Sequence, residues 1–136
     1  MGSQINPFHL KVKVKDLEST RKFYCEILGC NEEAANQKQI ELDFFGNQLS
    51  AFVDGKAKLK KRDKQTEFGC YLSLEQFSVI RKKLEKAAIA HNVKHINWPA
   101  DSDLQQFDLE VDDFSGNSLA FTSLQQEGKL SEIKLN

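Results

Sequence analysis

The chain of 136 residues has few of the residues that would assign it to a special class of protein. It contains only 2 Pro and 7 Gly, which excludes a proline-rich linker or a collagen-like repeat. No segment is apolar over the length needed to cross a bilayer, and the residues after Met1 do not combine a basic start with an apolar stretch. We therefore expect a cytoplasmic protein with no membrane partner.

Cysteine is also scarce. Cys25, Cys30 and Cys70 are an odd number with no CxxC pair, which argues against a disulfide framework and against a zinc site made of cysteines. Cys25 and Cys70 lie within apolar patterns, whereas a reactive thiol needs a cationic, partly exposed setting. We expect reduced, mostly buried thiols.

No excess of one charge is present. With 19 Lys and Arg against 20 Asp and Glu, the formal net charge is −1, so no global field would attract nucleic acid. The basic run at residues 56–64 has no interleaved aromatic residues for base stacking, and a solvated connection is its simpler interpretation. We expect no nucleic-acid partner.

The residues that are present are typical of a globular protein. Hydrophobic residues make up 40% of the chain, charged residues 29%, and 10 residues are Phe. A chain of this length can bury one sizeable core, so one domain is expected.

The first half predicts a strand, a helix and further strands. Apolar residues alternate over 8–14, which indicates a half-buried strand. Asp16 is a candidate N-cap for a helix that should run to about Leu28, with Gly29 as its C-terminal cap. Alternation returns at 40–44, and the turn at 45–47 leads into a strand at 49–53. The polar stretch from Cys30 to Asn36 precedes these strands, and two or three strands are expected in all.

The second half repeats this order. Residues 67–72 alternate like the first strand, and Ser73 and Gln76 have the spacing of a capping box for a helix ending near Ala90. Strands are predicted at 93–97 and around Phe107, Leu109 and Val111, and a last one contains Leu119 and Phe121.

A duplication of about 60 residues explains this repetition. The segment Asp43-Phe44-Phe45-Gly46-Asn47-Gln48-Leu49 parallels Asp113-Phe114-Ser115-Gly116-Asn117-Ser118-Leu119. We predict a single domain over residues 1–124, with one module at about 7–54, a linker at 55–66, a second module at about 67–124, and a polar tail at 125–136.

Each predicted module has the order βαβββ, and its helix can cover only one face of a mostly antiparallel sheet. We therefore expect an α+β fold in which two tandem modules form an open cup or barrel-like sheet. Strand parity places His9, Lys11 and Lys13 on the uncovered face of the first module, and Glu67, Gly69 and Tyr71 on that of the second. His9 and Glu67 should occupy equivalent positions, and the lysines would favour an anionic ligand.

Several short motifs carry a resemblance to a known family. They are Pro7-Phe8-His9-Leu10, Asp16-Leu17, Phe23-Tyr24, Leu28-Gly29-Cys30, and the two repeated Asp-Phe-x-Gly-Asn segments. In order and spacing they resemble the vicinal oxygen chelate superfamily, which includes glyoxalases, bleomycin-resistance proteins and extradiol dioxygenases. The similarity extends over nearly all of residues 7–124.

The resemblance implies a divalent metal with three protein ligands. The first would be His9, the second falls at Glu67 in place of a His, and the third falls at Ala120 in place of a Glu. A methyl group cannot coordinate a metal, so a working site with Fe, Mn, Ni or Zn would need another donor. By strand parity, Glu41, Asp108 and Glu110 are the candidates.

Two hypotheses about function follow. The chain is either a metal-dependent dioxygenase or lyase that uses His9 and Glu67, or a metal-free protein that binds or sequesters a small molecule as bleomycin-resistance proteins do. In both cases we expect a small-molecule ligand. The candidate ligand-binding residues are Lys11, Tyr71, Trp98 and Gln105, the last two as parts of a lid. The resemblance also implies a homodimer.

Overall fold

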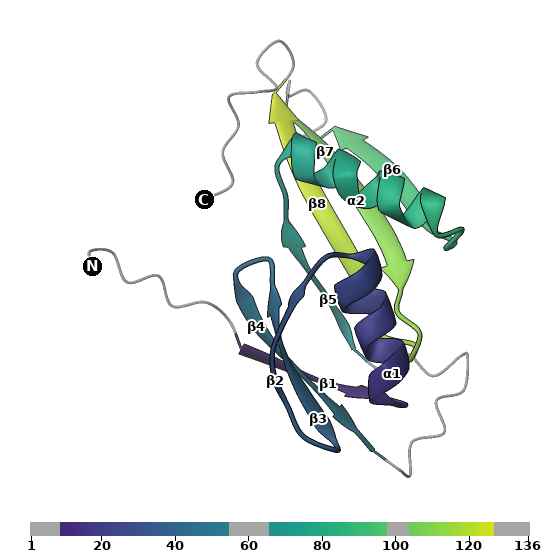
Figure 1. The fold of residues 1–136 in the computed structure, drawn as a ribbon. Coiled ribbons are helices and arrows are strands. Elements are labelled where there is room, and N and C mark those ends of the chain that lie inside the picture. The colour runs from purple at the N-terminus through teal and green to yellow at the C-terminus, as the bar shows by residue number, and fades with distance from the viewer. Residues whose placement is uncertain (1–8, 55–65, 98–103, 127–136) are drawn as a thin grey trace, which may run out of the picture. The chain divides into compact units, whose positions relative to one another are not determined.

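The computed structural model describes residues 9–54, 66–97 and 104–126 (Figure 1). The chain divides into two compact units. The first unit comprises residues 1–66 together with 113–117, and the second comprises 67–112 together with 118–136. Trp98, most of the predicted linker (55–65) and residues 127–136 of the predicted tail lie outside the described residues.

The first unit contains one mixed sheet of four strands. Its strands are β1 (His9–Val14), β2 (Asn31–Ala35), β3 (Gln39–Phe44) and β4 (Asn47–Val53). Their order is β1-β4-β3-β2, with β1 parallel to β4 and the other neighbours antiparallel. Strand β2 lies in the polar stretch after Gly29, and all of its side chains are exposed. Two strands, at 40–44 and 49–53, are predicted after the helix from alternating apolar residues. Strand β2 brings their number to three, within the predicted two or three.

The predicted helix follows β1. Asp16 caps it by accepting a hydrogen bond from the Ser19 backbone N at 2.6 Å. The helix α1 (Leu17–Thr20) continues directly into η1 (Arg21–Ile27), a segment of wider π-helical turns. It ends as predicted before Gly29, whose φ of 88° suits a residue without a side chain.

The helix and one face of the sheet enclose the core of the first unit. Period-2 alternation turns the apolar residues of each strand toward the helix. The buried side chains of β1, β3 and β4 on this face are Val12, Val14, Ile40, Leu42, Phe44, Leu49 and Ala51. Phe23 and Tyr24 from η1 are 0% exposed, and their rings meet edge to face with centroids 4.9 Å apart. The opposite face of this sheet is left uncovered by the helix.

The second unit repeats the topology of the first. Its strands are β5 (Glu67–Tyr71), β6 (Asn92–Asn97), β7 (Leu104–Asp112) and β8 (Ser118–Gln126). They lie in the order β5-β8-β7-β6, with β5 parallel to β8 and the other pairs antiparallel. The predicted duplication is therefore confirmed in strand order and direction. The α+β class is also confirmed, and each sheet is open.

Helix α2 (Leu74–Lys86) packs on β8 (Figure 1). Its buried side chains are Phe77, Ile80 and Leu84. The predicted capping box is present, because Ser73 and Gln76 bond each other's backbone N–H groups. The helix ends at Lys86 and not near Ala90. Ala88 adopts a left-handed conformation with φ 57°, which stops helical propagation.

The segment 113–117 connects β7 to β8 and belongs to the first unit. Asp113 accepts hydrogen bonds from the Tyr24 hydroxyl at 2.7 Å and from the Asn117 side-chain amide at 2.9 Å. The same amide donates to the Lys13 carbonyl at 3.0 Å, and the Phe114 ring meets Phe23 with centroids 5.3 Å apart. The second copy of the Asp-Phe-x-Gly-Asn motif, at 113–117, is therefore a buried part of the first unit.

Strand β8 extends past the predicted start of the tail. Gln125 is 4% exposed and, like Gln126, belongs to β8. In the described residues no helix combines the length and the apolar character that crossing a membrane requires.

Candidate functional site

The uncovered face of the first sheet gathers polar side chains from three strands. Strand registers place His9 beside Gln48, Lys11 beside Ser50, and Glu41 beside Ser50 on its other side. These residues alternate with the buried apolar ones, so they share the face that the helix leaves open. His9 and Lys11 therefore lie on the uncovered face, as strand parity predicts. Side chains of β3 and β4 share this face with them.

Glu41 is the centre of a hydrogen-bond network on this face. Its Oε1 accepts from the Ser50 hydroxyl at 2.5 Å and from the Gln48 amide at 2.7 Å, and its Oε2 accepts from the Gln39 amide. The bond from Ser50, reinforced by those from the two amides, lowers the pKa of Glu41 from its ordinary value, and partial burial opposes this. Glu41 is therefore an ionised acceptor with both oxygens in use.

Proton accounting then determines the role of His9. Its Nε2 lies 3.0 Å from the Ser50 hydroxyl. A hydroxyl has one proton, and a carboxylate can only accept, so Ser50 donates to Glu41 and accepts from His9. His9 therefore carries its proton on Nε2 in this contact, and Nδ1 is its only ring nitrogen that can hold a free lone pair.

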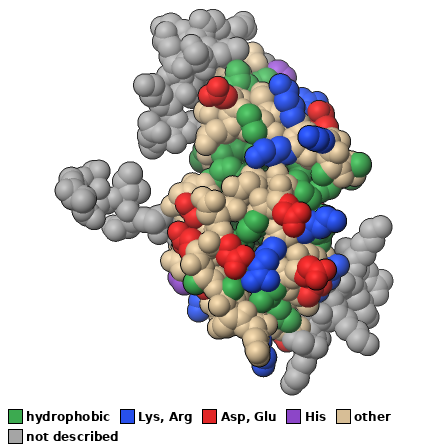
Figure 2. All heavy atoms as spheres, viewed as in Figure 1, with side chains coloured by type: hydrophobic (Ala, Val, Ile, Leu, Met, Phe, Trp, Pro, Cys, Tyr) green, Lys and Arg blue, Asp and Glu red, His purple; other side chains and the backbone are tan. Residues whose placement is uncertain are grey.

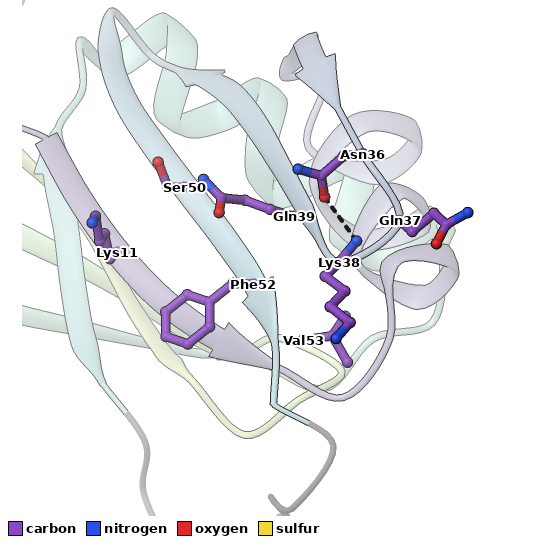
Figure 3. Close-up of a pocket in the computed structure, with 8 residues that line it drawn as sticks. All are labelled: Lys11, Asn36, Gln37, Lys38, Gln39, Ser50, Phe52 and Val53. Atoms are coloured by element: carbon purple, nitrogen blue, oxygen red, sulfur yellow. Dashed lines mark hydrogen bonds between the residues drawn. The ribbon is translucent and has the colours of Figure 1, made fainter.

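A cavity of about 720 Å³ opens beside this network (Figure 3). Its lining residues all belong to the first unit and are Lys11, Asn36, Gln37, Lys38, Gln39, Ser50, Phe52 and Val53. They come from β1, the turn between β2 and β3, the start of β3, and β4. Figure 3 shows the Phe52 ring with Lys11 on one side and Lys38 on the other. Hereafter this cavity is called the β4 pocket.

The β4 pocket carries positive charge. Its lining contains two lysines and no carboxylate, and both lysines are exposed. Within the described part of the chain, neither Lys11 nor Lys38 forms an ion pair, whereas Lys13 on the same strand as Lys11 lies 3.7 Å from Asp54. Because both side chains are exposed, an anion from solution can reach Lys11 and Lys38.

The open face of the second sheet has a different network. Asp108 accepts hydrogen bonds from the Thr122 hydroxyl at 3.0 Å and from the Gln106 amide at 3.0 Å, and Glu110 forms an ion pair with Lys94 at 3.2 Å. Tyr71 lies on this face and is 60% exposed. Tyr71 and Glu67 share one strand face as predicted, and their role in ligand binding stays a prediction.

The registers also show which positions correspond between the two units. In the second unit Glu67 pairs with Ser118, and Ala120 follows Ser118 by two residues. In the first unit His9 pairs with Gln48, and Ser50 follows Gln48 by two residues. Ser50 is therefore the counterpart of Ala120. The hydroxyl that links His9 to a carboxylate in the first unit is replaced by a methyl group in the second.

The donors within each unit do not fit a resident metal. His9 uses its Nε2 in a hydrogen bond to Ser50, and Glu41 uses both of its carboxylate oxygens in hydrogen bonds. The Ser50 hydroxyl lies between the His9 ring and the Glu41 carboxylate. Within either unit, the described residues bring no three His, Cys, Asp or Glu side chains close enough to hold a metal ion. Metal ligation by His9 and Glu67, which belong to different units, stays a prediction.

Gln105 lies on the opposite face of its sheet from the predicted lid position. It alternates with Phe107, which meets Phe77 of the covering helix, so Gln105 is on the helix side of β7. Its Oε1 lies 3.1 Å from His95 Nε2, and the His95 ring stacks on Phe107 with centroids 4.5 Å apart. Trp98, the other residue predicted in the lid, lies outside the described residues.

The cysteines match the expectation of unreactive thiols. Cys30 is buried, Cys25 and Cys70 are half-buried, and burial raises the pKa of Cys70 to about 12. Burial also raises the pKa of Cys25, and the charge of Glu32 acts in the same direction. Neither thiol is poised to form a thiolate near neutral pH.

Sequence reasoning missed most of the β4 pocket. Gln39, Ser50 and Phe52 could have been found by following strand parity from β1 into β3 and β4. Asn36 and Lys38 follow the exposed edge strand β2, whose sequence is a polar stretch without alternation, and no pattern in the sequence connects them to β4.

Comparison with known proteins identifies the fold. No protein-family model matches the chain, and no curated protein matches it. Among solved structures, a glyoxalase/bleomycin resistance protein/dioxygenase from Alicyclobacillus acidocaldarius is 23% identical, with a TM-score of 0.74, and the match covers 90% of this chain and 94% of that one.

Two further structures agree. A domain of the same description from Frankia sp. EAN1pec is 17% identical, with a TM-score of 0.69 over 93% of this chain and 96% of the other. The fosfomycin resistance protein FosX from Listeria monocytogenes is 13% identical, with a TM-score of 0.62 over 90% and 94%. The chain therefore has the vicinal oxygen chelate fold of the glyoxalase, bleomycin-resistance and dioxygenase proteins, as its sequence motifs predict.

Proposed function

We propose that this protein binds a small anionic molecule in the β4 pocket and does so without a metal ion. The observation that carries this proposal is the lining of the pocket, which contains Lys11, Lys38 and the Phe52 ring and no carboxylate. The volume of about 720 Å³ lies in the range that small-molecule sites occupy.

The lining also indicates the chemistry of the ligand. Phe52, Val53 and the alkyl stems of the two lysines provide apolar surface, and the ammonium groups of the lysines provide positive charge. Such a surface suits a compact acid with an aromatic or aliphatic body, because the body covers Phe52 while the acid group meets a lysine. Both lysines are exposed, so the attraction is screened by salt and the affinity should fall as ionic strength rises.

The structural relatives are consistent with this class of function. Among them are proteins named for resistance to bleomycin and to fosfomycin, which are small molecules. Because the fold hosts several activities, the proposal rests on the pocket of this chain and takes only general support from those names.

Paired ligands test the proposal. Benzoate and benzamide have nearly the same shape and differ in charge, so isothermal titration with each isolates the contribution of the anion. We expect benzoate to bind more tightly than benzamide by about tenfold, and we expect Lys11→Gln and Lys38→Gln each to reduce this preference. Lys22→Gln removes the same charge from η1 and serves as the matched control. Equal affinities for the two ligands would refute the proposal.

The alternative function is a dioxygenase or lyase with one Fe, Mn, Ni or Zn ion at His9 and Glu67. The observation that favours it is the presence of His9 on the open face of the first sheet. Metal analysis of untagged protein, followed by titration of each metal into the wild type, His9→Ala and Glu67→Ala, tests this alternative. Stoichiometric metal that is lost in both variants would establish it and overturn the metal-free proposal.

A further inference from the structure

The β4 pocket combines cationic donors with hydrogen-bond acceptors. Lys11 and Lys38 supply cationic donors at the sides of Phe52. Ser50 and Gln39, which also line the pocket, both donate to the carboxylate of Glu41. The hydrogen-bonding capacity that Ser50 and Gln39 have left therefore decides which ligand group these two side chains can bind.

Ser50 has no proton left for a ligand. Its only hydroxyl proton goes to Glu41, and one of its lone pairs receives the proton of His9 Nε2. A ligand approaching Ser50 from the pocket therefore meets an oxygen with one free lone pair. That oxygen can accept a hydrogen bond and cannot donate one.

Gln39 is oriented in the same sense. An ionised carboxylate can only accept hydrogen bonds, so the Gln39 amide must turn its nitrogen toward Glu41. Gln39 Nε2 is indeed the atom that contacts Glu41. Figure 3 shows the Gln39 oxygen turned toward Phe52 and its nitrogen turned toward Ser50. The pocket thus meets a carbonyl oxygen here, backed by the negative charge of Glu41.

Resting on the proposed function, we propose that the ligand carries a hydrogen-bond donor, a hydroxyl or ammonium group, in addition to its acid group. Ser50 and Gln39 receive this donor, and the lysines receive the acid. Hydroxy acids and amino acids are the ligand classes with this pair of groups, whereas a dicarboxylate would place its second anion against acceptors near Glu41. Glu41 acts as a positioning residue that holds both acceptors in orientation.

A set of three acids tests the inference by NMR titration. Benzoate provides the acid alone, 4-hydroxybenzoate adds a donor, and 4-methoxybenzoate places an oxygen at the same position with no proton to donate. We expect 4-hydroxybenzoate to bind about fivefold more tightly than either of the others, the gain of one hydrogen bond. In Ser50→Ala and Gln39→Leu this advantage over benzoate, measured in the same variant, should shrink toward equal affinities.

The control is Ser118→Ala, which removes a hydroxyl that also bonds a carboxylate, that of Asp112 in the second unit at 2.9 Å. It should leave the advantage of 4-hydroxybenzoate intact. Equal affinities for the three acids, or an advantage that survives both Ser50→Ala and Gln39→Leu, would overturn the inference. Failure of benzoate itself to bind would instead overturn the proposed function, so the two failures are distinguishable.

Discussion

Asp113 shows how a single residue holds a connecting segment in the core of the first unit. Its Oδ1 accepts from the backbone N–H groups of Ser115 at 2.8 Å and Asn117 at 2.9 Å, and its Oδ2 accepts from Tyr24 and the Asn117 side chain. Four hydrogen bonds satisfy a carboxylate that is only 6% exposed. The counterpart residue Asp43 instead caps an exposed turn by accepting from the Gly46 N–H at 2.8 Å.

Tyr24 should keep its proton far into the alkaline range. Burial, the charge of Asp113 and the hydrogen bond to it raise the pKa of Tyr24 well above its ordinary value of 10.0. Because the folded-state pKa is raised, this contribution to stability is complete below about pH 10 and is lost as the pH rises above it. Alkali should therefore unfold the protein before Tyr24 ionises.

The variant Tyr71→Phe isolates this behaviour, because Tyr24 is then the only one of the 2 tyrosines left. We expect tyrosinate absorbance to appear in step with loss of the circular dichroism signal. Tyrosinate that forms reversibly while the fold is intact would contradict the buried hydrogen bond to Asp113. In the matched variant Tyr24→Phe, only Tyr71 can form tyrosinate. Unfolding of this variant should therefore add no tyrosinate absorbance from residue 24.

At the scale of elements, glycines act in two different ways. At the tight turn between β3 and β4, Phe45 and Gly46 have φ values of 52° and 88°, and a Cβ on Gly46 would meet nothing within 4 Å. Gly69 in β5 lies in the second sheet, where a Cβ would stand 1.6 Å from the Ala120 carbonyl oxygen of β8. Glycine at position 46 allows the left-handed backbone conformation of the turn. Glycine at position 69 leaves room for the backbone of β8.

Alanine substitutions separate these two causes. Gly46→Ala should cost about 1 kcal/mol of the free energy of unfolding, the penalty for a left-handed alanine. Gly69→Ala should cost several times more, because the atom it meets belongs to the backbone of β8 and β5 must move away. Urea unfolding of the two variants gives the comparison. Similar losses in both would show that β5 is not packed closely against β8.

At the scale of the whole molecule, the duplication made the fold predictable from the sequence. Each half has the same alternating strand, capped helix and Gly-Asn turn, and these local signals agree with the topology of each unit. The cup between the modules stays a prediction. Local patterns do not predict the β4 pocket, because Glu41 meets Ser50 only through the register of β3 and β4, which those patterns do not specify.

The distribution of charge supports a local and not a global electrostatic role. On the face shown in Figure 2, acidic and basic side chains of the described residues are interspersed. The net charge of −1 agrees with this mixture. An anion would therefore be recognised by the two lysines of the β4 pocket and not by a field of the whole molecule.

The most direct test of this account is a map of backbone amide shifts during titration of the labelled protein with benzoate. We predict that the largest shifts occur at Lys11, at 36–39 and at 50–53, and that benzamide needs about tenfold higher concentration than benzoate to produce them. Largest shifts on β5 and β8 of the second unit, or no saturable shifts at all, would contradict the assignment of the β4 pocket as the anion-binding site.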